Sequence, residues 1–141
     1  MTSNATLAIQ SLATLLSPLA EGPVRIGRAA LETTSAKLPA ITIWSKSDTP
    51  TGNNDPVEFP VEFTRSLVIE CKALAEDDYH ETLDGMLSDV RKAIQFTPSN
   101  PDILGGYAIR LKINESQFFA PTAEVDSAVV QIPIEFDYVE I

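Results

Sequence analysis

The sequence predicts an α+β fold in which a mixed, mostly antiparallel β-sheet packs against two α-helices. Two stretches with apolar residues at three- and four-residue spacing indicate the helices, over 4–19 and from 77 to about 95. Two stretches in which apolar and polar residues alternate, 59–73 and 130–138, indicate long strands with one buried face. The 141 residues, 44% of them hydrophobic, fit a single domain spanning 1–141.

The first predicted helix is more apolar than a surface helix needs to be. Ser3 or Asn4 can cap its start, Pro18 lies within its last turn, and Gly22 and Pro23 end it. No charged residue precedes Glu21. We therefore expect this helix to pack against something along most of its circumference.

Two shorter strands and a loop are predicted between this helix and the long strand 59–73. The strands cover 24–26 and 38–44, whereas 45–56 consists of turn-forming and polar residues. This composition predicts a flexible loop at about 45–57. Arg65 interrupts the apolar positions of the long strand and indicates a bulge or a bend there.

The C-terminal part of the chain predicts two more strands. Residues 109–113 alternate between apolar and polar, a loop follows at about 117–126, and 130–138 forms the last strand. Proline lacks the N–H that a central strand donates, so Pro133 indicates an edge position or a bulge.

Charge and composition argue against several functions. The chain has 10 Lys and Arg against 20 Asp and Glu, a net charge of −10, which disfavours a broad nucleic-acid-binding face. Its apolar runs are too short to span a membrane, and no basic residue precedes Arg25 as a signal peptide would require. A single cysteine, Cys71, fits a reducing cytoplasm. We therefore expect a soluble, acidic, intracellular domain.

The residues needed for common catalytic chemistry are scarce. His80 is the single histidine and is interpreted as a solvated helix residue, while the position of Cys71 points into the core. One cysteine and one histidine cannot form a zinc site, and the acidic run 76–78 is interpreted as a helix cap. We predict no catalytic, cofactor-binding or metal-ligating residue, and no enzymatic activity. A carboxylate acid/base or magnesium site stays an alternative.

Exposed-looking aromatic residues are more informative. Trp44 is predicted to end a strand at the mouth of the loop, and at least one of Phe118 and Phe119 should face outward. They either cover a sheet edge or form a subunit interface, and Arg65 is expected in an ion pair across subunits or within the sheet. The candidate interface residues are Trp44, Asp48, Asn53, Asn54, Arg65, Phe118 and Phe119.

The order of elements carries a family resemblance. After the apolar N-terminal helix come the segments LPAITIW, a polar loop, FTRSLVIECKALAEDD, YHETLDGMLSDVRKAI and SAVVQIPIEFDYVE. In this order the chain resembles the tail terminator family of long-tailed bacteriophages (siphoviruses), typified by the lambda minor tail protein U. The resemblance covers nearly the whole chain but consists of patterns of residue type, so no family residue is transferred to a position here.

The resemblance implies a structural function. A homo-hexameric ring would cap the tail tube, stop polymerisation of the tail tube protein and provide the surface for a head–tail connector or head completion protein. The location implied is the head-proximal end of the virion tail, after assembly in the host cytoplasm. Two alternatives stay open: another ring-forming tail or connector protein, such as a tube subunit, and a small enzyme or binding domain with a carboxylate site.

Overall fold

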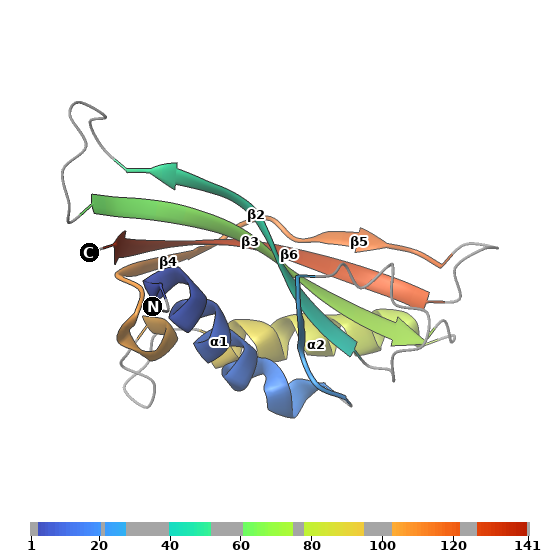
Figure 1. Cartoon of the computed structure of the whole chain (residues 1–141). Coiled ribbons are helices and arrows are strands. Elements are labelled where there is room, and N and C mark those ends of the chain that lie inside the picture. The colour runs from blue at the N-terminus through green and yellow to red at the C-terminus, as the bar shows by residue number, and fades with distance from the viewer. Residues whose placement is uncertain are drawn as a thin grey trace.

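The computed structural model describes residues 3–20, 22–27, 40–51, 61–74, 78–94, 103–121 and 127–140. These residues form two α-helices and a six-stranded, mostly antiparallel sheet, with both helices on one face of the sheet (Figure 1). The predicted α+β fold is confirmed. None of the described helices is long and apolar enough to span a membrane. The elements are α1 (Asn4–Leu16), η1 (Ser17–Leu19), β1 (Arg25–Ile26), β2 (Ala40–Pro50), β3 (Val61–Leu74), α2 (Tyr79–Ile94), η3 (Ile103–Gly106), β4 (Arg110–Ile113), β5 (Gln117–Phe119) and β6 (Ser127–Glu140).

The two longest strands form the centre of the sheet. β3 and β6 pair antiparallel over 14 residues each, from Val61 opposite Glu140 to Leu74 opposite Ser127. The strand order is β1-β2-β3-β6-β4, and β5 also pairs with β6. β1 pairs parallel to β2, and every other pair among the described strands is antiparallel.

The core lies between the helices and the facing side of the sheet. Alternate residues of β3 and β6 point to this side, as the period of two predicts. Ser3 caps α1 by accepting a hydrogen bond from the Thr6 N–H at 3.1 Å, which confirms one of the two predicted caps. Both helices bury one stripe of residues, namely Ala5, Ala8, Ile9, Leu12 and Leu16 of α1 and Leu83, Met86, Leu87, Val90 and Ile94 of α2.

The predicted loop at about 45–57 is wrong for its first part, because β2 continues as a strand to Pro50. Residues 45–50 are exposed, and all of them except Lys46 pair with β3, so this half of the strand needs no apolar alternation. The bulge expected at Arg65 lies in β2 instead. There the register shifts between Ser45 and Ser47 and leaves Lys46 as the extra residue. Residues 52–57 lie outside the described residues.

Pro133 is not on an edge strand, because β6 is flanked by β3 on one side and by β4 and β5 on the other. The Pro133 carbonyl accepts a hydrogen bond from the Asn114 N–H at 2.8 Å, in the gap between β4 and β5. The proline nitrogen points to this same side, where no ladder bond is needed. The loop predicted at 117–126 also begins with a strand, since Gln117–Phe119 forms β5; residues 122–126 lie outside the described residues.

A close backbone contact holds η3 against α1. Leu104 and Gly105 both have positive φ, 48° and 72°. A Cβ atom at Gly105 would lie 2.8 Å from Ser11 Oγ and 3.3 Å from Ser11 Cβ. Position 105 therefore requires glycine for two reasons together: glycine adopts the left-handed backbone without strain, and it has no Cβ to collide with α1.

Gly105→Ala should lower the free energy of unfolding by about 1–3 kcal/mol, because it adds both backbone strain and a collision with Ser11. Chemical denaturation measures the loss. Gly85→Ala in α2 is the matched control: nothing lies within 4 Å of its added Cβ, so it should gain roughly 0.5–1 kcal/mol. Equal effects at the two positions would contradict the close contact.

Candidate assembly interface

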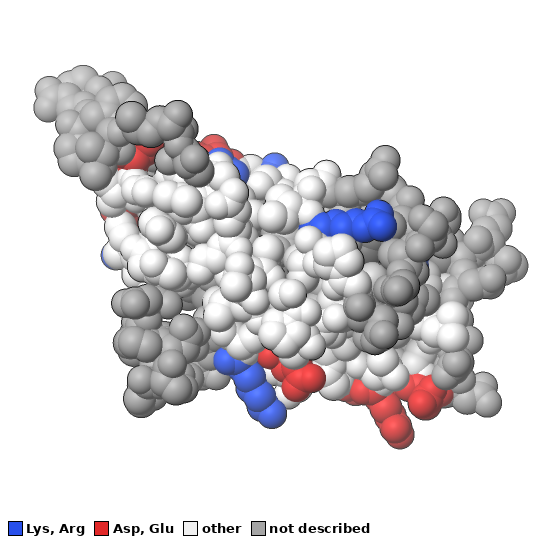
Figure 2. All heavy atoms as spheres, turned by 60° about the horizontal axis from the view of Figure 1, so that its bottom comes forward, with Lys and Arg blue, Asp and Glu red and all other residues white. Residues whose placement is uncertain are grey.

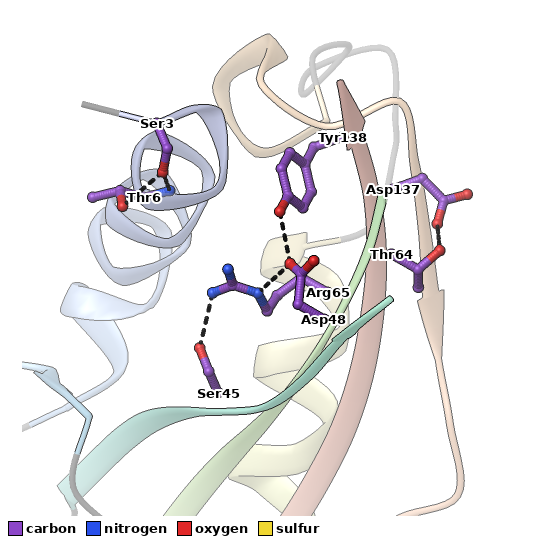
Figure 3. A network of polar contacts seen from close by, with 8 residues as sticks. All are labelled: Ser3, Thr6, Ser45, Asp48, Thr64, Arg65, Asp137 and Tyr138. Atoms are coloured by element: carbon purple, nitrogen blue, oxygen red, sulfur yellow. Dashed lines mark hydrogen bonds and ion pairs between the residues drawn. The ribbon is translucent and has the colours of Figure 1, made fainter. Parts of the chain in front are cut away.

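Three strands are joined by a polar network on the helix-facing side of the sheet (Figure 3). Arg65 Nε donates to Asp48 Oδ2 at 2.7 Å, and Tyr138 Oη donates to the same oxygen at 2.6 Å. Arg65 Nη1 also donates to Ser45 Oγ at 3.2 Å. Asp48 lies directly opposite Arg65 in the β2–β3 register. Of the two expectations for Arg65, the ion pair within the sheet is confirmed.

Burial and pairing both act on the groups of this network. The side chains of Arg65 and Asp48 are 23% and 30% exposed, so solvent screens the pair incompletely. Burial acts to lower the pKa of Arg65, but the hydrogen bond and charge of Asp48 outweigh it and raise the pKa. Burial, together with the Asp48 carboxylate, raises the pKa of Tyr138 to about 12. Arg65 therefore stays charged and Tyr138 stays neutral over the physiological pH range.

A second network fastens β4 on the opposite face of the sheet. Thr64 Oγ1 donates to Asp137 Oδ1 at 2.6 Å, and Arg110 Nε donates to Asp137 Oδ2 at 2.8 Å. Arg110 Nη2 also pairs with Glu62. Burial acts to raise the pKa of Asp137, but the bonds from Thr64 and Arg110 outweigh it and lower the pKa. Arg110 is 63% exposed, so these bonds position β4 more than they stabilise it.

Trp44 does not lie at the end of its strand, as the sequence predicts, but in the middle of β2. Its indole Nε1–H donates to Glu70 Oε1 at 3.0 Å, and Gln131 Nε2 donates to the same oxygen at 2.7 Å. Glu70 is buried. Trp44 therefore satisfies a buried carboxylate of the same subunit by donating a hydrogen bond to it, and its ring is half-buried.

Phe118 and Phe119 are the exposed aromatic pair of the described residues. They lie on β5, opposite Val130 and Val129, and are 50% and 39% exposed. Because successive side chains of a strand point to opposite faces, the two rings stand on the two sides of the sheet edge. The sequence predicts that at least one of the two rings faces outward, and both are exposed. Asn53 and Asn54, also candidates, lie outside the described residues.

The residues examined for catalysis have structural surroundings. Cys71 is buried, and burial together with the nearby charge of Glu70 raises its pKa to about 12. His80 is an exposed residue of α2, and its ring stacks on Tyr79 at 4.2 Å. Within the described residues, no three His, Cys, Asp or Glu side chains are grouped so that they could hold a metal ion.

A hollow beside β4 bears on the carboxylate-site alternative. Its two acids, Glu135 and Asp137, share the lining with Arg110 and Lys112, and Asp137 is paired with Arg110. The hollow is open to solvent and its acidic groups face bases. One of the two carboxylates, that of Asp137, is therefore already engaged by Arg110.

Two important participants are missed by the sequence interpretation. Tyr138 occupies an apolar position of β6, which the alternation places on the buried face, and Glu70 occupies a polar position although it is buried. The polar partners of both residues come from other strands, so their roles depend on the register between strands. An aromatic residue with a hydroxyl near the end of a buried face is the one available signal for Tyr138.

Comparison with known proteins adds no assignment: no family model matches the chain, and no curated protein matches it. The tail terminator resemblance therefore stays a prediction from the sequence.

Tyr138→Phe should lower the free energy of unfolding by about 1 kcal/mol at neutral pH, because it removes the hydrogen bond to Asp48. The pKa of Tyr138 is raised in the folded state, so its contribution is complete below the unfolded pKa of about 10 and is lost as the pH rises towards about 12. Denaturation of both proteins from pH 7 to 12 measures the difference. The exposed Tyr107→Phe is the control, and a pH-independent difference would contradict the network.

The Cys71 thiol should not react with a water-soluble thiol reagent in the native protein, because it is buried and its pKa is raised to about 12. One equivalent should react in denaturant. Rapid native labelling at neutral pH would show that the strand centre opens far more readily than its packing implies.

Proposed function

We propose that this chain is a structural tail terminator subunit, which forms a ring that caps a phage tail tube. The observation that carries the proposal is the agreement between the quoted segments and single elements. YHETLDGMLSDVRKAI coincides with α2, SAVVQIPIEFDYVE coincides with β6, and FTRSLVIECKAL lies within β3. The segments that carry the family resemblance are therefore also the elements that build the sheet and its helical layer.

The use of the carboxylates supports a structural role over a carboxylate-site enzyme. Asp48 and Asp137 each join side chains from different strands. Glu70 is likewise the shared acceptor of two side chains from neighbouring strands. Groups committed to cross-links stiffen the sheet, as a subunit that must present fixed surfaces to its neighbours requires.

The physics of a capping ring agrees with the charge of the chain. Identical subunits close a ring when one surface binds a different surface of the next copy and the rotation closes. DNA passes through the centre of such a ring on its way along the tail. A net charge of −10 per subunit disfavours retention of the phosphates, so the ring would let the DNA pass. Six subunits, the tube protein below and a connector above follow from the resemblance.

Electron microscopy of the purified protein tests the proposal, with and without tail tubes of the same phage. Discrete rings, or caps on tube ends that stop further addition of tube protein, are expected. Tubes alone are the control. Long polymers of this chain would assign it as a tube subunit instead, and protein that neither forms rings nor binds tube ends would overturn the tail assignment.

A further inference from the structure

One uncharged surface is formed by α1 and the segment that follows η3. Neither 3–20 nor 103–109 contains a charged residue, and the contact between Gly105 and Ser11 joins the two segments. Figure 2 shows a white area without charged side chains at the left of its centre, bordered on the right by one basic side chain, whereas further charges lie along the lower edge. We call this area the α1–η3 surface; its exposed residues include Thr6, Gln10, Thr14 and Tyr107.

A second uncharged surface surrounds β5. Residues 116–121 contain no charge, and Phe118 and Phe119 stand exposed on them. Among the described residues, six large hydrophobic side chains are exposed, and three of them lie on these two surfaces: Tyr107, Phe118 and Phe119. Exposed apolar groups gathered in charge-free areas are typical of the centre of a protein–protein interface.

The two surfaces lie at opposite ends of β6. The start of α1 is fixed near its C-terminal end, where Asn4 Nδ2 donates to the Val139 carbonyl at 2.7 Å. β5 pairs with residues 129–131 near the other end. The eight residue steps from Gln131 to Val139 span about 26 Å of strand. Surfaces separated in this way cannot cover each other within one subunit, but they can meet between two copies.

Electrostatics favours these surfaces over the rest of the chain for contact with a second copy. Each copy carries a net charge of −10, so two copies repel each other least when both facing surfaces are neutral. The comparison with α2 is informative, because α2 fills its exposed positions with charged residues such as Glu81, Asp84 and Lys92. Neutral Thr6, Gln10 and Thr14 occupy the exposed positions of α1, and their burial would leave no unpaired charge.

We propose that these two surfaces bind each other. The β5 edge of one copy, with Phe118 and Phe119 on its two sides, packs on the α1–η3 surface of a second copy, which leaves the remaining surface of each type free for a third. This head-to-tail contact rests on the proposed function, for which it supplies the contact between neighbouring ring subunits.

Cysteine pairing tests which surfaces meet. Gln10→Cys on α1 and Gln117→Cys on β5 leave both phenylalanines in place, and both positions are exposed. A mixture of the two variants should form a cross-linked heterodimer with a short bismaleimide reagent, and neither variant should cross-link to itself. Ser88→Cys on the charged helix α2 is the control and should cross-link with neither. Self-linking of either variant alone, or no heterodimer at millimolar concentration, would overturn the proposal.

Charge placed on the α1–η3 surface tests its energetic role. Gln10→Glu with Thr14→Glu adds two carboxylates one helical turn apart, both at exposed positions, so the fold should persist in circular dichroism. Self-association measured by sedimentation velocity should weaken at least about tenfold, because these carboxylates must be desolvated in the contact. Ser88→Glu should associate like the wild type. Undiminished association of the double variant would contradict the contact.

The proposed contact and the proposed function can fail separately. Rings or tube caps that persist in the double Glu variant would overturn the contact and keep the tail function. If the two surfaces cross-link but the protein does not bind tube ends, the proposed contact is kept and the proposed function is overturned.

Discussion

The structure depends on the pairing of β3 with β6. Every other strand except β1 attaches to one of these two, and both helices pack on the face that they share. Their register decides which residues face the helices. If one strand slipped by one residue, its outward-facing side chains would turn towards the helices. Buried apolar groups such as Ile69 and Ile132 would then exchange places with polar residues such as Glu70 or Gln131. The apolar alternation of two long strands thus specifies the architecture.

Polar networks fix the alignment of the strands at the end of the sheet that holds Asp48 and Tyr138. The apolar core supplies the cohesion around Leu67 and Ile134, and Arg65 occupies the next core-facing position of β3. Its ion pair with Asp48 fixes β2 after the bulge at Lys46, and Arg110 fixes β4 in a similar way on the other face. The ion pairs Arg65–Asp48 and Arg110–Asp137 are therefore both made within the subunit at this end.

Elements with their own periodicity could be predicted from the sequence, as α1, α2 and β6 show, because each carries a local pattern of buried positions. The second half of β2 could not be predicted. Its strand conformation comes from pairing with β3, and its residues are those of a loop. The interpretation of Pro133 rested on a correct physical rule, but where β6 changes partner depends on the register of two other strands.

The candidate site, too, could be predicted only in part from the sequence. The sequence identified Arg65 and the Phe118–Phe119 pair as unusual because each departs from its local pattern, and it identified Asp48 as a residue of the predicted polar loop. It could not identify Tyr138 as their partner, since Asp48 and Tyr138 are 90 residues apart and meet only when β2, β3 and β6 are aligned. Trp44 looked like an exposed aromatic because its acceptor, Glu70, lies on another strand. The type of a residue therefore indicates that its position is unusual, and the register between the strands determines which partner its side chain meets.

The division of one sheet edge between β4 and β5 has a consequence for motion. Leu111 and Ile113 pack against the core and Arg110 is paired, so β4 is anchored by its side chains. The three residues of β5 are all exposed and are attached to β6 through their backbone. Because Pro133 interrupts the ladder between them, β5 can open without disturbing β4. The aromatic pair thus stands on the most readily released strand of this edge, where its angle can adjust while the domain beneath keeps its shape.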